Sequence, residues 1–212
     1  MMKILKKIKI MKTQNAIGSA GSGGAVTVIG AKDAGGATLS LDIPSGVTVV
    51  WKANYSGAVD NPSVLIELSG VGTFEVAQSG SIRNNDNGFA IRNDTSKCTI
   101  AVSGGTVSAA VNTIKARGNI SVSGGTVSAD GGGWTIEGYG PSDTAVTVSG
   151  GSVIGGNNGD AIRAFDGIKV IISGGTVSGN GSNGVTILIS GESSVTVVAA
   201  RWNPRKTKLS TV

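Results

Sequence analysis

The sequence predicts an all-β fold, a right-handed parallel β-helix with three short strands in each coil. The first observation is a phrase, Ser-Gly-Gly-(Thr/Ser)-Val, that begins at four positions spaced 20, 26 and 24 residues apart. The second is the alternation of β-branched apolar residues with small polar ones around each copy, which is typical of strands. The third is repetition at this period, which is typical of a solenoid whose coils bury their apolar side chains against each other. The copies occupy residues 103–107, 123–127, 149–153 and 173–177.

Each repeat holds three strand-like stretches separated by Gly, Ser, Asn and Asp. One precedes the repeated phrase, one contains its valine, and one is centred on an isoleucine. Equivalent strands of successive coils lie about 4.8 Å apart, so their inward side chains form columns that fill the interior without large aromatic residues. The glycine pairs are expected at corners, and the handedness follows from the general rule for parallel crossovers. The predicted columns are Val102, Val122, Val148 and Ile172; Val107, Val127, Val153 and Val177; and Ile91, Ile114, Ile136 and Ile162.

Residues 20–80 are predicted to form earlier, less regular coils of the same rod. Strand candidates there are 25–29, 38–43, 47–52, 64–68 and 73–76. The predicted organisation is a basic N-terminal segment or cap (1–19), a single β-helix domain (20–200) and a basic C-terminal tail or cap (201–212). The first 12 residues either begin a secretory signal, although they lack its apolar run of about 7–15 residues, or form a short amphipathic helix that caps the first coil.

The net charge of +5 arises from the ends of the chain. Between Thr13 and Ala200 there are nine basic and thirteen acidic residues, a net charge of −4. No specific nucleic-acid partner is therefore expected, although basic tails bind phosphate backbones without sequence preference. No segment approaches the roughly 20 apolar residues of a membrane span, so no membrane span is expected.

The residue types present exclude several kinds of chemistry. The chain contains no histidine, which removes the commonest general base and zinc ligand. Its lone cysteine, Cys98, has no partner for an internal disulfide and shares the parity of Ile100 and Val102, so a buried thiol is expected. Glycine runs such as residues 131–133 precede no amphipathic helix and are therefore no nucleotide fingerprint.

Candidate binding residues lie outward beside the isoleucine column. Equivalent positions of four coils form a charged ladder whose opposite signs either pair on a solvated face or line a groove for an anionic sugar. The longest coil, between Ser123 and Ser149, places Tyr139 one turn from Phe165, which would give a flat surface for a sugar ring. Trp134 lies in the same coil and is also compatible with the core. The ladder residues are Arg92, Lys115, Glu137 and Arg163.

Hard oxygen ligands follow in the next loop. Asp160, Asp166, Asn157 and Asn158 supply carboxylate and amide oxygens, of which calcium takes 6–8. The same residues are also common in turns. Calcium is therefore the only cofactor considered, through Asp160, Asp166 and Asn157.

Two outward columns of hydroxyl residues flank the valines of the repeated phrase. They are either ordinary solvated surface or an array that orders water, as in ice-binding β-helices. The columns are Thr106, Thr126, Ser152 and Thr176, and Ser108, Ser128 and Ser178, with Ile154 in the remaining position.

The phrases Val-Ser-Gly-Gly-Thr-Val-Ser-Ala and Gly-Asp160-Ala-Ile-Arg-Ala resemble repeats in secreted and cell-surface proteins of Gram-positive bacteria. Over about residues 79–200 the chain is similar to the pectate-lyase-like β-helix superfamily, and within it to clostridial carbohydrate-binding β-helix proteins. The resemblance implies polysaccharide binding, often of acidic sugars, sometimes with calcium and usually without catalysis. For the acidic ligands and basic residue of lyases the chain offers only Asp160, Asp166 and Arg163, without a full lyase motif.

The expected function is therefore that of a non-catalytic extracellular or cell-surface β-helix. It would bind a polysaccharide, such as a host or cell-wall glycan, or serve as an adhesin or stalk. The alternatives are a polysaccharide lyase or glycoside hydrolase, which would need suitably spaced carboxylates among Asp143, Asp160 and Asp166, a structural spacer, or an ice-binding surface. Uncapped coil ends would also favour end-to-end homo-oligomers.

Overall fold

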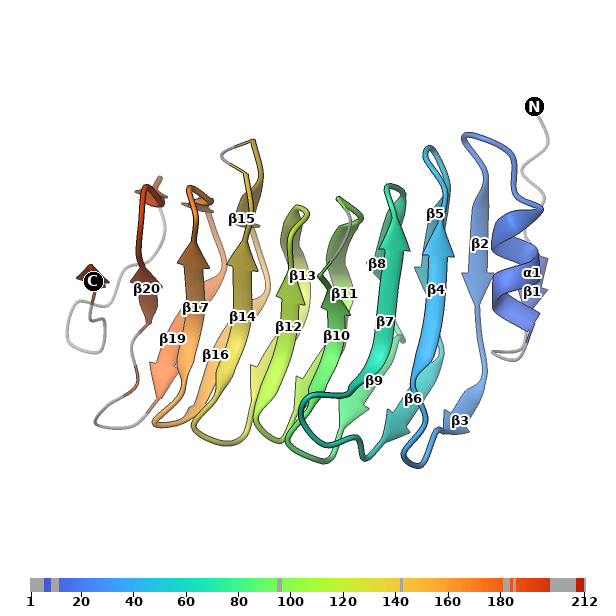
Figure 1. The fold of residues 1–212 in the computed structure, drawn as a ribbon, viewed down its shortest axis with the longest axis horizontal. Coiled ribbons are helices and arrows are strands. Elements are labelled where there is room, and N and C mark those ends of the chain that lie inside the picture. Colours follow the sequence, from blue (N-terminus) through green and yellow to red (C-terminus); the bar gives the residue numbers. More distant parts are fainter. Residues whose placement is uncertain are drawn as a thin grey trace.

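In the computed structural model the chain winds into a parallel β-helix, and each turn contributes one strand to each of three walls (Figure 1). The solenoid makes about seven turns with three strands per coil, which confirms the predicted fold class. The structure describes residues 6–8, 12–94, 97–141, 143–180, 184, 186–198 and 209–211, with the backbone alone for residues 6–8 and 209–211.

Every strand pairs in parallel with its equivalents in the neighbouring coils. Wall 1 consists of β1 (Lys6–Ile8), β2 (Ala25–Val28), β5 (Thr48–Trp51), β8 (Thr73–Val76), the first halves of β11 (Thr99–Ala109) and β13 (Ile120–Ala129), β15 (Ala145–Val148), β18 (Lys169–Ile172) and β21 (Ser194–Val197). Wall 2 consists of β3 (Ala31–Asp33), β6 (Asn54–Gly57), β9 (Ser81–Asn84), the second halves of β11 and β13, β16 (Ser152–Asn157) and β19 (Thr176–Asn180). Wall 3 consists of β4 (Leu39–Ile43), β7 (Val64–Gly70), β10 (Phe89–Asn93), β12 (Asn112–Ala116), β14 (Trp134–Tyr139), β17 (Asp160–Phe165), β20 (Ile187–Ile189) and β22 (Leu209–Thr211).

The glycine pairs of the repeated phrase form the corner between walls 1 and 2. In β11 and β13 the strand continues through this corner with a shift in register. The second glycine adopts a positive φ in three of the four copies: 69° at Gly125, 66° at Gly151 and 72° at Gly175. A side chain at Gly125 would also collide with the carbonyl oxygen of Gly105. Only glycine meets both requirements without strain.

A short helix, α1 (Thr13–Gly18), closes the N-terminal end of the rod (Figure 1). Ile17 is fully buried and joins the core. The Gln14 side chain pairs with the outer edge of β4: Nε2 donates to the Asp42 carbonyl oxygen at 3.1 Å, and Oε1 accepts from the Asp42 N–H at 2.9 Å. The amide thus takes the place that a further strand would occupy at this sheet edge.

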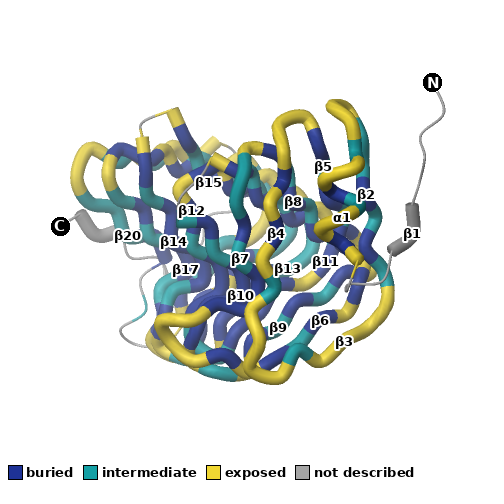
Figure 2. Tube along the Cα trace, turned by 45° about the vertical axis from the view of Figure 1, so that its right-hand side comes forward, coloured by how far each residue is buried: buried dark blue, intermediate teal, exposed yellow. Residues whose placement is uncertain are grey.

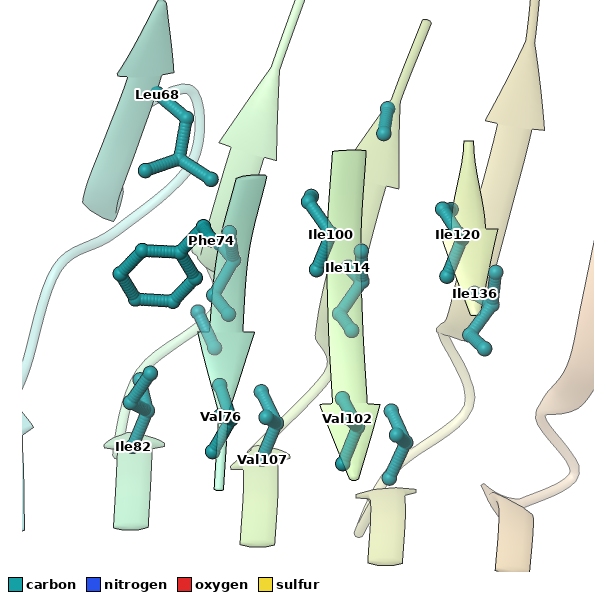
Figure 3. Close-up of a cluster of buried hydrophobic side chains, with 14 of the residues drawn as sticks. Leu68, Phe74, Val76, Ile82, Ile100, Val102, Val107, Ile114, Ile120 and Ile136 are labelled. Carbon is teal, nitrogen blue, oxygen red and sulfur yellow. The ribbon is translucent and has the colours of Figure 1, made fainter. Parts of the chain in front are cut away.

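The inward columns are those that the sequence predicts. The register pairs each column residue with its equivalent in the next coil. All four isoleucines of the wall 3 column are fully buried, while Val177 near the C-terminal end is only partly covered. Buried residues line the inside of every wall and exposed residues mark the turns (Figure 2), and Ile100, Ile114, Ile120 and Ile136 pack in the interior (Figure 3).

Large aromatic residues do fill the core of the earlier coils. Trp51 lies 5.7 Å from Tyr55 and 5.6 Å from Phe74, measured between ring centroids, and all three are buried. The predicted columns of the repeated coils contain no aromatic side chain, and the aromatic part of the core lies in the earlier, less regular coils. These aromatic side chains pack beside aliphatic residues such as Val49 and Val76, which are also fully buried.

The predicted basic ends contain regular structure where they are described. Residues 6–8 form β1, which pairs with β2, and the helix follows the lysine-rich stretch. At the other end β22 pairs with β20; residues 199–208 lie outside the described part of the chain. Among the described residues, no helix has the length and apolar character needed to cross a bilayer.

Candidate functional site

The outer surface of wall 3 brings together all seven predicted binding residues, and we call it the aromatic face. Its strands align Arg92, Lys115, Glu137 and Arg163 in one column, as predicted. Tyr139 and Phe165 are direct neighbours in β14 and β17, and Trp134 lies opposite Asp160 at the start of the same pair. The face is defined by Glu67, Phe89, Arg92, Asp94, Lys115, Arg117, Trp134, Glu137, Tyr139, Asp160, Arg163 and Phe165.

Lys115 occupies the middle of the first cluster on this face. Its Nζ lies 3.3 Å from Glu137 Oε1, 5.0 Å from the centre of the Tyr139 ring and 5.8 Å from that of Phe89. Glu137 is 8% exposed, so the ion pair is shielded from water on one side. The Glu137 carboxylate thus balances the charge of this ammonium group, and two ring faces stabilise it further.

Arg163 organises a second cluster in the same way. Its guanidinium carbon lies 4.4 Å from the centre of the Trp134 ring and 5.1 Å from that of Phe165. Nε lies 3.6 Å from Asp160 Oδ2, which is an ion pair but too long for a hydrogen bond. That Nε is buried and has no hydrogen-bond partner among the described residues.

Arg92 turns away from Lys115, its neighbour of like charge in the column. It binds Glu67 in the preceding coil, with Nη2 2.7 Å from Oε2, and its Nε lies 3.1 Å from Asp94 Oδ2. Like charges directly opposite each other on parallel strands repel. The ladder therefore resolves into separate ion pairs rather than one continuous chain of alternating charges.

Tyr139 connects two coils that are not adjacent. Its hydroxyl donates a hydrogen bond to the Asp94 carboxylate. Burial, that hydrogen bond and the negative charge of Asp94 raise the pKa of the Tyr139 hydroxyl well above its usual range. The phenol therefore stays a neutral donor at physiological pH, with its ring fixed in place on the face.

Arg117 differs from the other cations on the aromatic face. Its guanidinium carbon lies 5.7 Å from the centre of the Tyr139 ring, and the residue is exposed. No carboxylate within the described part of the chain forms an ion pair with it, whereas Arg92, Lys115 and Arg163 each have one. The four carboxylates of the face balance its four cations in number, yet they leave Arg117 free to bind an anion from outside.

Sequence reasoning missed four members of this face. Phe89, Asp94, Arg117 and Glu67 contact the predicted residues but were not singled out. The signal was present for Arg117, because it follows Lys115 by two residues as Tyr139 follows Glu137. Extending the column alignment by one outward position would have placed it beside Tyr139.

Trp134 lies on the outer surface although it shares the parity of the buried Ile136. Thr135 and Ile136 are both fully buried, so the strict alternation is interrupted between them. The Thr135 hydroxyl donates to the Ile154 carbonyl at 2.8 Å, which satisfies it inside the rod. This local irregularity directs Trp134 outward, towards Arg163.

The three predicted metal ligands do not converge. Asp160 begins β17 and Asp166 follows its last residue, so about 20 Å of extended strand separates them. Asp160 lies beside Arg163, and Asn157 ends β16 in register with Asn180. Within the part of the chain that the structure describes, no cluster of three acidic, histidine or cysteine side chains could hold a metal ion.

A shallow depression of about 430 Å³ lies on wall 2, at the N-terminal end of the rod. Three charged residues line it, and two of them, Arg83 and Asp33, have partners, whereas Lys32 pairs with no described residue. Arg83 binds Asp130 at 2.7 Å, and Asp33 Oδ1 accepts a hydrogen bond from the Gly35 N–H at 2.9 Å. The aromatic face, which combines an unpaired arginine with three ring surfaces, is the stronger candidate site.

Sequence models of known protein families, curated proteins and solved structures give no match to this chain.

Proposed function

We propose that this protein is a non-catalytic polysaccharide-binding β-helix, secreted or displayed at a cell surface, and that an acidic sugar chain lies along its aromatic face. The observation that carries the proposal is the succession of Arg117, Tyr139 and Phe165 at equivalent positions of three consecutive coils. Equivalent positions repeat about every 4.8 Å along the rod, a spacing suited to the successive rings of an extended polymer.

The rings of this face supply area for sugar binding. Trp134, Tyr139 and Phe165 are half-buried, so part of each ring faces solvent while its position is fixed by neighbours. Rigid aromatic side chains offer a large contact area at low conformational-entropy cost. The apolar faces of a sugar ring would pack on this surface, and nearby polar groups would meet its hydroxyls.

The preference for an acidic sugar rests on Arg117. A planar guanidinium binds a carboxylate through two parallel hydrogen bonds, which gives both strength and geometry. Because the other cations of the face already have carboxylate partners, Arg117 is the group with capacity for a ligand's carboxylate. A uronate stacked on Tyr139 would place its acid group beside this guanidinium.

The carboxylates favour binding over hydrolysis. Glycoside hydrolysis needs one carboxyl group whose pKa is raised so that it donates a proton. Asp143 shows the opposite: its hydrogen bond from the Lys97 ammonium lowers the pKa of that carboxyl, and the two groups lie 2.8 Å apart. Asp160, for its part, already forms an ion pair with the Arg163 guanidinium.

Calorimetric titration with galacturonate and cellulose oligosaccharides of equal length tests the proposal. Arg117→Ala should weaken galacturonate binding about 10- to 100-fold, the contribution of a hydrogen bond to a charged group, and leave binding of the neutral oligosaccharide unchanged. Phe165→Ala should weaken both. Lys169→Ala removes an exposed cation from wall 1 and serves as the matched control.

Two further measurements complete the test: the dependence of binding on ionic strength and an assay for reaction products. Galacturonate binding should weaken as ionic strength rises, because Arg117 is exposed to screening. Absence of binding to either oligosaccharide, or equal affinity of the wild-type and Arg117→Ala proteins for galacturonate, would refute the proposal. Steady release of unsaturated products or reducing ends would replace it with an enzymatic function.

A further inference from the structure

Wall 2 carries an array of hydroxyl groups on a surface separate from the aromatic face. Strands β11, β13, β16 and β19 align the first and third residues of each Thr-Val-Ser-like triplet in register. Neighbouring coils are about 4.8 Å apart, and the two columns, two residues apart on each strand, are separated by about 6.7 Å. We call this surface the hydroxyl face; it comprises Thr106, Thr126, Ser152 and Thr176, and Ser108, Ser128, Ile154 and Ser178.

The positions of these hydroxyls are fixed by the core beneath them. Val107, Val127 and Val153, which lie between the two columns, are fully buried. The inward valine of each triplet anchors its strand, and the threonines themselves have restricted χ1 rotamers because they are β-branched. The array is therefore ordered before any ligand arrives.

Most of these hydroxyls have no partner inside the protein. Thr106, Thr126, Ser128, Ser152 and Thr176 make no side-chain hydrogen bond to any described residue. The exceptions lie at the borders of the array: Ser108, which is buried, accepts from Arg83 at 3.3 Å, and Ser178 donates to the Gly179 carbonyl oxygen at 3.1 Å. The central hydroxyls must therefore bind solvent.

The hydroxyl face also lacks charge. None of its eight residues is ionisable. At the edge of the face, Arg83 and Asp130 form an ion pair with each other. A charged group would hold its own strongly oriented hydration shell and disrupt any regular water layer. Uncharged hydroxyls in a two-dimensional array instead hold water molecules at regular intervals.

We propose that the hydroxyl face orders its first layer of water into an ice-like lattice, so that the protein adsorbs to ice. The ligand is then the surface of a growing crystal, and the Thr and Ser hydroxyls together with the threonine methyl groups form the contact. This activity is independent of sugar binding, because it uses the outer surface of wall 2 instead of wall 3.

Partitioning of the protein into slowly grown ice tests this proposal. The wild-type protein should be enriched in the ice relative to a globular protein of similar mass without ice affinity. Thr126→Lys places a hydrated charge at the centre of the array and should abolish the enrichment. Thr147→Lys makes the same change at a half-buried outward threonine of β15 on wall 1 and should retain it.

Folding is controlled by comparing circular dichroism and thermal unfolding of the variants with those of the wild type. If Thr126→Lys does not fold, Thr106→Lys tests the same surface at a more exposed position. Arg117→Ala should keep its ice enrichment whatever its effect on sugar binding. The proposal is overturned if wild-type protein is excluded from ice like the reference, or if the wall 1 and wall 2 variants behave alike.

Discussion

At the scale of single residues, Cys98 shows what the interior of the rod does to a reactive group. The residue is fully buried immediately before β11, as its parity with Ile100 predicts. Burial raises the pKa of its thiol to about 12. Nucleophilic attack and alkylation require the thiolate, so this cysteine is inert in the folded protein.

We predict that Cys98 resists iodoacetamide at pH 8.5 in the native protein and reacts after unfolding in urea. The pKa is raised in the folded state, so its contribution to stability is complete below the unfolded value of about 8.5 and declines as pH rises towards 12. Between those values the free energy of unfolding should fall by up to about 1.4 kcal/mol per pH unit more than in Cys98→Ala. Rapid native alkylation, or identical pH profiles from urea titrations, would show that the thiol is accessible.

The buried columns and Cys98 could be predicted from the sequence because strict alternation decides which side of a strand faces inward. Trp134 could not be placed in this way, since two consecutive buried residues, Thr135 and Ile136, interrupt the alternation. The ion-pair partners of the charged residues could not be predicted from the sequence either. Arg92 binds Glu67 rather than a member of its predicted ladder, because side-chain direction depends on repulsion between neighbours as well as on register.

At the scale of elements, helix α1 shows how the edge of wall 3 is covered at the N-terminal end of the rod. Its Gln14 amide satisfies both backbone groups of Asp42 on β4. Of the early strands, β2, β4, β5, β7 and β8 could be predicted from apolar alternation. The short strands β3 and β6 could not, because Ala31–Asp33 and Asn54–Gly57 contain few apolar residues; β3 pairs with β6, and β6 pairs with β9.

Removing the Gln14 amide should weaken this end of the solenoid. We expect Gln14→Ala to lower the free energy of unfolding by about 1 kcal/mol, since two exposed hydrogen bonds are lost. Urea unfolding should show a lower midpoint at an unchanged slope. Gln78→Ala is the matched control, because Gln78 is exposed and makes no side-chain hydrogen bond to a described residue. Equal midpoints for the two variants would argue against the edge-capping role.

At the scale of the whole molecule, one repeated three-stranded coil generates two chemically different surfaces. The inward valine fixes each coil, the small hydroxyl residues beside it form the face of wall 2, and the varied residues of the third strand form the aromatic face of wall 3. The sequence predicts this division because in-register stacking places equivalent residues of successive coils in a row along the axis of the rod. It does not predict that Asp160 and Asp166 lie at opposite ends of one strand, which becomes evident only when the strand boundaries are known.

Register is also what both proposed binding surfaces require, and engineered disulfides measure it directly in a Cys98→Ala background. Ser121 and Thr147 are paired neighbours on wall 1, with Cα atoms about 4.8 Å apart, within the range that a disulfide spans. Replacing both with cysteine should give an efficient intramolecular disulfide on mild oxidation, detected by peptide mass spectrometry. The offset pair at Ser121 and Ala145, about 8 Å apart, should give little. Preferential cross-linking of the offset pair would contradict the stacking of coils on which this account depends.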